Sequence, residues 1–181
     1  MASATVYAGA GDGNVRYAGT GQSWATIRNA ASGTDAGPTT ANDHSCYADS
    51  SNPMIYRAFY PFDLSVLPGG AVISAIGLNV YVVAKSSAAG GSVTVVSNSQ
   101  ASNTTLVTSD YSLVGSTEWV AARTNFSALT ASAYNVFTLN ATAVASAQAA
   151  ITGFWKVALR SSFDLDNSAP VGTSYLQGNF S

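Results

Sequence analysis

Hydrophobic and polar residues alternate along much of the chain, and this period-two pattern predicts β-strands. The pattern is clearest at residues 54–63, where one face carries Tyr56, Ala58, Tyr60 and Phe62 and the other carries Ile55, Arg57 and Phe59. This is a strand with aromatic rings on both faces. Pro61 has no N–H to donate within a sheet, so it predicts an edge position or a bulge near the end of this strand.

Shorter strands are predicted on either side of it, at residues 4–7, 14–17, 25–28, 75–83, 92–96, 134–139 and 154–160. The last of these places Trp155, Val157 and Leu159 on one face. Residues 86–91 read as the turn of a hairpin between two of the strands, and residues 106–114 hold a helical turn. Residues 29–53 read as a long irregular loop, which is the first place to look for a contact site.

One segment has a helical composition. Residues 141–151 are rich in alanine, with Asn140 as a plausible N-cap and Gly153 as a stop. Many short strands with one short crossover helix predict an all-β, antiparallel β-sandwich rather than a parallel βαβ fold. A length of 181 residues suits one domain, so we expect a single domain over residues 1–181.

The composition limits the partners. Apolar residues make up 47% and charged residues 9% of the chain, so Ser, Thr, Asn and Gly must supply the polar surface. Such a surface suits proteins that pack against copies of themselves or contact sugars. With seven Lys plus Arg and a net charge of -2, nucleic acid is not an expected partner. We also expect no membrane span, because no window approaches 18 consecutive apolar residues.

The chain has few of the side chains that commonly act in enzyme catalysis. The chain has one histidine, one cysteine and one glutamate, which are His44, Cys46 and Glu118. His44 and Cys46 lie close in sequence, but nucleophilic catalysis needs a base in contact with the thiolate and a third group that orients the base. A metal site formed by Asp43, His44 and Cys46 would lack a second ligand cluster. We therefore expect a protein that is not an enzyme.

A calcium site is a more specific hypothesis. Asp164 and Asp166 stand one residue apart after a predicted strand, so an extended backbone would turn both carboxylates to one side. With Asn167 or backbone carbonyls, they would give the oxygen ligands that calcium prefers. The alternative is an Asx-type turn with solvated carboxylates.

Aromatic residues in or near the predicted loops are candidates for sugar binding. Sugar rings stack on exposed aromatic faces, so an exposed cluster would support glycan recognition. The alternative for each residue is packing in the core or at the edge of the sandwich. The candidates are Tyr17, Trp24, Tyr47, Tyr111 and Trp119.

Two longer runs resemble the DNRLRE-type domains and their jelly-roll relatives. One is Phe62-Asp-Leu-Ser followed by Leu67-Pro-Gly and by the strand-like run that ends at Tyr81, and the other is Phe137-Thr-Leu with the later Gly153-Phe-Trp-Lys-Val-Ala-Leu-Arg-Ser. The resemblance implies a jelly-roll β-sandwich, of a kind found in carbohydrate-binding modules, bacterial surface proteins and phage virion proteins. It also supports a structural calcium ion, which related jelly rolls hold between their terminal strands.

Both ends of the sequence bear on this resemblance. The N-terminus has no basic region followed by an apolar one, which favours a virion protein over a secreted one. The family ends with a further strand, whereas this chain stops shortly after Tyr175. Three explanations are open: a shortened strand, a domain cut short, or a strand supplied by a neighbouring chain.

These observations together predict a non-catalytic structural or attachment module. We expect it in a phage virion or another extracellular or cell-surface assembly, associating with copies of itself or with other proteins of the assembly. The alternative is a carbohydrate-binding module that recognises glycans through exposed aromatics.

Overall fold

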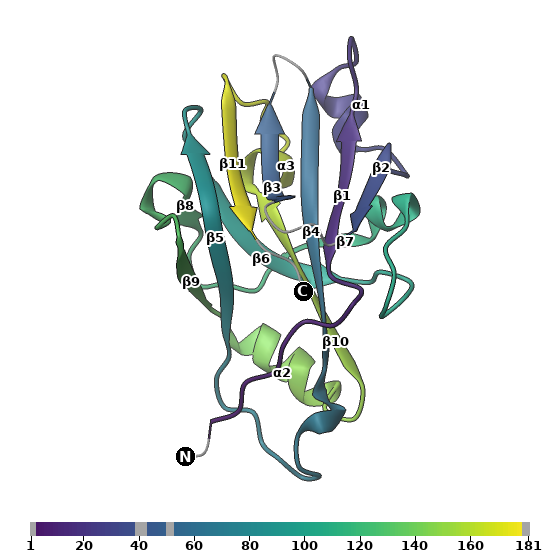
Figure 1. The fold of residues 1–181 in the computed structure, drawn as a ribbon, viewed down its shortest axis with the longest axis vertical. Coiled ribbons are helices and arrows are strands. Elements are labelled where there is room, and N and C mark those ends of the chain that lie inside the picture. The colour runs from purple at the N-terminus through teal and green to yellow at the C-terminus, as the bar shows by residue number, and fades with distance from the viewer. Residues whose placement is uncertain (1–2, 39–42, 50–52, 179–181) are drawn as a thin grey trace.

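The computed structural model describes residues 3–38, 43–49 and 53–178, with only the backbone described at Pro38 and residues 43–46. These residues contain eleven strands, and every strand pairing is antiparallel. The protein is thus an all-β antiparallel sandwich with few helices, as the sequence predicts (Figure 1). Within the described residues, no helix is long and apolar enough to cross a membrane.

The strands form two layers. The first layer runs in the order β9 (Ala133–Thr138), β5 (Gly77–Ser87), β11 (Thr173–Gly178), β3 (Asp43–Asp49), β4 (Met54–Asp63), β1 (Gly13–Ala18) and β2 (Asp35–Pro38). The second layer consists of β7 (Val114–Glu118), β6 (Ser92–Asn98) and β10 (Phe154–Ser161), and the short β8 (Thr124–Asn125) also pairs with β6. The jelly-roll topology stays a prediction.

The long strand β4 joins the two layers. Its first half pairs with β3, where Tyr56 lies opposite Tyr47, and its second half pairs with β10, where Phe62 lies opposite Trp155. Strand β1 pairs with β4 at Ala58, where β10 also pairs, so β1 and β10 occupy opposite edges of β4. The layers therefore diverge from β4. Pro61 lies beyond the end of β1, where its missing N–H leaves no gap in that pairing.

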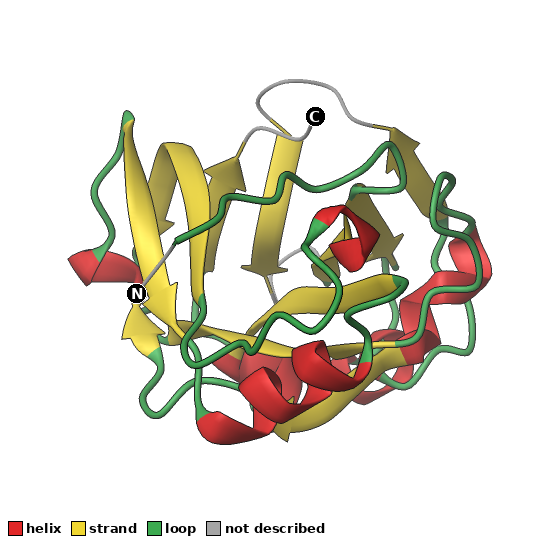
Figure 2. Cartoon of the chain, turned by 90° about the horizontal axis from the view of Figure 1, so that it is seen from below, coloured by secondary structure: helices red, strands yellow, loops and turns green. Residues whose placement is uncertain are grey.

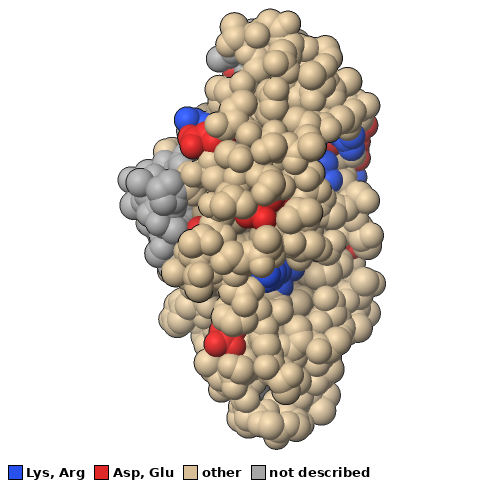
Figure 3. Space-filling model, turned by 90° about the vertical axis from the view of Figure 1, so that its right-hand side faces the viewer, with Lys and Arg blue, Asp and Glu red and all other residues tan. Residues whose placement is uncertain are grey.

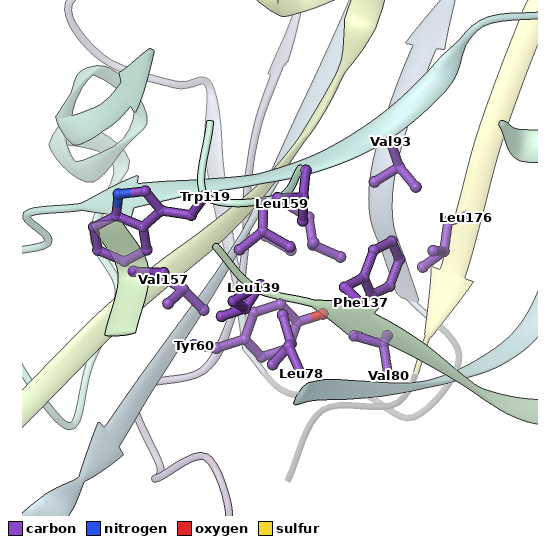
Figure 4. Close-up of a cluster of buried hydrophobic side chains, with 14 of the residues drawn as sticks. Tyr60, Leu78, Val80, Val93, Trp119, Phe137, Leu139, Val157, Leu159 and Leu176 are labelled. Carbon is purple, nitrogen blue, oxygen red and sulfur yellow. The ribbon is translucent and has the colours of Figure 1, made fainter. Parts of the chain in front are cut away.

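Figure 2 shows the strands of the two layers from below. The main core lies between the layers, and its side chains come from the inner faces of both (Figure 4). The cluster includes Ala58, Tyr60, Leu78, Val80, Val82, Val93, Val95, Phe137, Val157, Leu159 and Leu176. The alternation predicted for residues 54–63 and 154–160 is confirmed, since these residues of β4 and β10 follow period two.

A second, smaller core covers the opposite face of β4. Its buried members are Val15, Ile27, Ile55, Phe59 and Tyr111. The side chains come from β1, β4, the short helix α1 (Trp24–Arg28) and the 3-10 helix η2 (Thr108–Leu113). Because β4 is buried on both faces, it needs large apolar residues at both odd and even positions. This explains the aromatics that its sequence places on both sides.

Helix α2 (Ala141–Ala149) connects β9 in the first layer to β10 in the second, as the predicted crossover helix. Asn140 is its N-cap, with its side-chain oxygen 3.1 Å from the backbone N of Ala143. Ala143 and Ala147 are buried against the main core. The remaining short helices are α3 (Ser162–Leu165), η1 (Leu64–Val66) and η3 (Phe126–Ala128).

Two predicted strands are wrong. Residues 25–28 lie in α1, which the Ser23 hydroxyl caps by accepting a hydrogen bond from the N–H of Thr26. Residues 4–7 form no strand, and next to them only Ala8 makes a single bridge, to Phe62.

Two predicted connections also differ from the structure. Residues 29–53 are not one loop, because β2 and β3 form there through pairing with β1, β4 and β11. Residues 86–91 do not close a hairpin, since β5 and β6 lie in different layers and the chain crosses between them at Gly90 and Gly91, both with positive φ. The segment around Tyr175 forms β11, a central strand between β3 and β5.

Candidate functional site

The residues of the calcium hypothesis lie in and after helix α3, not in an extended segment. The Ser161 hydroxyl caps this turn by accepting a hydrogen bond of 3.1 Å from the N–H of Asp164. In a helical turn, residues two apart do not face the same side. The expectation that Asp164 and Asp166 point together is therefore wrong. Asn167 follows with a φ of 55°, a left-handed conformation that asparagine tolerates.

Asp164 is fully buried between two arginines. Arg57 donates to its two carboxylate oxygens at 2.8 and 2.7 Å, and Arg160 donates to the same two oxygens at 2.8 and 2.9 Å. Arg28 donates to the backbone carbonyls of Asp164 and Leu165. Burial alone would raise the pKa of the Asp164 carboxyl, but the charges and hydrogen bonds of Arg57 and Arg160 lower this pKa to about 2.

Asp166 belongs to a separate ion pair at the surface. Arg123 binds Asp166 and also Glu118, with 2.8 Å between its Nη2 and a Glu118 oxygen. Hydrogen bonds from Arg123 lower the pKa values of both carboxyls. A calcium ion at Asp164 or Asp166 would thus have to displace guanidinium groups. Among the residues that the structure describes, no three His, Cys, Asp or Glu side chains gather where they could hold a metal ion.

Three of the five candidate aromatics belong to the second core. Tyr111 is fully buried. Its hydroxyl donates to the backbone oxygen of Ile27, and its ring centroid lies 3.9 Å from the guanidinium carbon of Arg57. Tyr17 packs against Tyr111 with 6.0 Å between ring centroids, and Trp24 packs against the same cluster. Tyr111 is therefore a core residue, and its prediction as a sugar-stacking residue is wrong.

The other two aromatics lie elsewhere. Trp119 is buried in the main core, stacked on Trp155 with 5.5 Å between centroids and 4° between planes, so its prediction as a sugar-stacking residue is also wrong. Tyr47 lies half-buried on the outer face of the first layer, next to Tyr175 with 6.1 Å between centroids and 15° between planes. Tyr56 lies on the other side of Tyr47, with 5.3 Å between their centroids. The five candidates do not form one binding face.

The hypotheses on Asp43, His44 and Cys46 concern side chains that lie outside the described residues. The backbone of these three residues runs within β3, where His44 pairs with Gln177 and Cys46 with Leu176.

An exposed apolar surface was not singled out from the sequence. On the outer face of β5 and β9, Tyr134 is 69% and Val136 is 62% exposed, and Tyr81 packs edge-to-face against Tyr134 at 5.2 Å. Neither residues 77–83 nor residues 133–138 include a charged residue. We call these three side chains the β5–β9 face. A signal for it was present in the sequence, because residues 134–139 carry large apolar side chains at both odd and even positions.

Strand β9 also lies at the end of the first layer. It pairs with β5 on one side, and no described strand pairs with the other side of Ala133–Thr138, although Leu139, just after the strand, forms a single bridge to Val120. Natural edge strands commonly carry charged residues or proline that discourage pairing with other chains. Strand β9, with the sequence Ala-Tyr-Asn-Val-Phe-Thr, carries neither. The structure thus places an uncharged apolar face directly beside an open sheet edge.

Charge is sparse elsewhere too, as Figure 3 shows for one side of the molecule. A comparison of the chain with models of known protein families and with curated proteins found no match, so the likeness to DNRLRE-type domains stays a resemblance of sequence motifs.

Proposed function

We propose that this protein is a non-catalytic structural or attachment module that associates with copies of itself in a phage virion or another extracellular surface assembly. The observation that carries the proposal is the β5–β9 face beside the open edge of β9. Isolated apolar residues are common on protein surfaces, whereas contiguous exposed apolar patches mark sites of association.

The partner best suited to this surface is a second copy of the chain. An uncharged face gives no charge complementarity to a foreign partner, whereas two identical copies can meet through the same apolar patch or through their β9 edges. The low overall charge, with 9% of residues charged, fits repeated contacts among like subunits. Association through the strand edge would add backbone hydrogen bonds to the burial of Tyr134 and Val136.

Light scattering after size-exclusion chromatography tests this proposal. The wild-type chain should elute as a defined oligomer at micromolar concentration. Val136→Lys should shift it toward the monomer, because association would bury a charge without a partner. Val72→Lys is the matched control, since Val72 is 84% exposed but lies in the loop before β5. A monomeric wild type, or equal dissociation in both variants, would contradict the proposal.

The alternative of glycan binding has one observation in its favour. Tyr47 and Tyr175 are neighbours on adjacent strands with nearly parallel rings on the outer face of the first layer, and such a pair can stack against a sugar. A glycan array tests this alternative directly. Binding that is lost in Tyr175→Ala and kept in Tyr134→Ala would favour a carbohydrate-binding module.

A further inference from the structure

Three arginines line one hollow on the outer side of β4 and β10. The hollow has a volume of about 250 Å³, with Arg28, Arg57 and Arg160 in its wall. Asn29 and Ser112, both exposed, lie at its rim. Arg57 and Arg160 are almost fully buried and Arg28 is partly open to solvent. The hollow therefore gives solvent access to guanidinium groups that are held in fixed positions.

Positive charge exceeds negative charge around this hollow. Arg28, Arg57 and Arg160 share a single carboxylate, that of Asp164. The neighbouring Arg123 lies between Asp166 and Glu118. Four guanidinium groups thus face three carboxylates, which leaves one net positive charge. This excess favours an anion in the hollow, because a charge in a partly desolvated site is stabilised by a counterion.

Some N–H groups of these arginines have no hydrogen-bond acceptor within the described residues. A guanidinium group has five N–H donors. Arg28 uses three of them, on Asn29 and on the backbone of Asp164 and Leu165. Arg57 uses four, two on the Asp164 carboxylate and two on backbone oxygens. Arg160 also uses four, three of them on Asp164. Each of the three arginines therefore retains at least one N–H for a ligand.

We propose that this hollow binds a small oxyanion through a carboxylate or phosphate group. The N–H groups that these arginines do not use on Asp164 or on the backbone can donate to an oxygen of either group, and the hydrogen bonds between Asp164 and its two arginines hold the guanidinium groups in place before the ligand arrives. The hollow is smaller than the sites that enclose drug-sized ligands, so the ligand is about the size of one sugar acid or one phosphate ester. This site is distinct from the β5–β9 face and does not depend on self-association.

Calorimetric titration with inorganic phosphate, with glucuronate and with uncharged glucose tests the proposal at constant ionic strength. The wild-type protein should bind at least one of the two anions saturably and should not bind glucose. The stronger anion identifies the source of the oxyanion. Arg28→Gln should weaken binding about tenfold or more, because it removes a hydrogen bond to a charged group. Arg16→Gln removes the same charge from the exposed pair with Asp35 and should leave binding unchanged.

A second variant keeps the test valid if Arg28→Gln does not fold. Ser112→Glu leaves all three arginines in place but adds a carboxylate at the exposed rim, which should compete with the anion and abolish its binding. The proposal is overturned if neither anion binds the wild type saturably, or if Ser112→Glu and Arg16→Gln bind the anion equally well.

Discussion

Replacing Asp164 by Asn should destabilise the protein by about 3–5 kcal/mol, the usual result of removing one partner from a buried ion pair. The carboxylate accepts four hydrogen bonds from Arg57 and Arg160, all between 2.7 and 2.9 Å. Asparagine has nearly the same shape but no charge, so it leaves Arg57 and Arg160 buried without a counterion. For a domain of this size, the loss corresponds to a fall in melting temperature of roughly 6–20 °C.

Urea unfolding followed by tryptophan fluorescence measures this effect, because Trp119 and Trp155 are buried in the main core. Urea is preferable to guanidinium salts, which change the ionic strength. Asp166→Asn is the matched control. Asp166 lies two residues after Asp164, and its replacement removes the same charge, but from a partly exposed ion pair with Arg123. Exposed ion pairs contribute about 0–1 kcal/mol. The reasoning is refuted if Asp164→Asn lowers the free energy of unfolding no more than Asp166→Asn does.

The pH dependence gives an independent check on Asp164. Its pKa is about 2 in the folded protein and roughly 3.9 in an unfolded chain. A carboxyl whose pKa is lowered by folding stabilises the fold at pH values above its pKa in the unfolded chain. This stabilisation is lost as the pH falls through the pKa of the folded protein. The difference in stability between wild type and Asp164→Asn should therefore be constant above about pH 5 and shrink by roughly 2–3 kcal/mol as the pH falls to about 2. A difference that is unchanged at low pH would contradict this assignment.

Three further predictions follow from other contacts. Gly33→Ala should destabilise the fold by about 1–3 kcal/mol in urea unfolding, because the new Cβ would lie 2.6 Å from a backbone oxygen of β1. Gly69→Ala is the control and should be neutral or slightly stabilising, because no atom lies within 4 Å of the new Cβ. Asn140→Ala should cost about 1–2 kcal/mol by the same assay, since Asn140 caps α2 and also donates to the backbone of β7. A chelator should leave the melting temperature unchanged, because arginines already bind the carboxylates of Asp164 and Asp166. A melting temperature that falls with the chelator and recovers with calcium would instead support the calcium hypothesis.

The elements that the sequence predicts well have a strong local signal. The alternation at residues 54–63 and 154–160 and the capped alanine-rich helix each appear in the structure close to the expected bounds. Strands β2 and β3 could not be predicted in this way, because their short sequences, Asp-Ala-Gly-Pro and Asp-His-Ser-Cys-Tyr-Ala-Asp, have no clear apolar period. Their pairing with β1, β4 and β11 forms them, and such contacts between distant segments are not visible in a local pattern.

The arginine hollow was less predictable for the same reason. Asp164 was recognised as a residue of interest, but its partners lie at positions 28, 57 and 160, and only the last is near it in sequence. The expectation that Asp164 and Asp166 point to one side rests on an extended backbone, whereas the Ser161 cap makes the segment helical. A better signal was the presence of Arg57 and Arg160 at strand positions where neighbouring residues are apolar, since a buried arginine requires an acidic partner.

The buried arginines around Asp164 are suited to binding a ligand as well as to stabilising the fold. The second core has only five buried apolar residues, and hydrogen bonds from Arg57 and Arg28 to backbone oxygens link η2, α1 and α3 beside it. Yet well-packed apolar residues of similar volume often stabilise a protein as much as a buried ion pair does. A chain with only 9% charged residues could therefore have closed this face with leucine or methionine. Arginines in that position do one thing that apolar residues cannot, which is to present N–H donors and positive charge to an anion in the hollow.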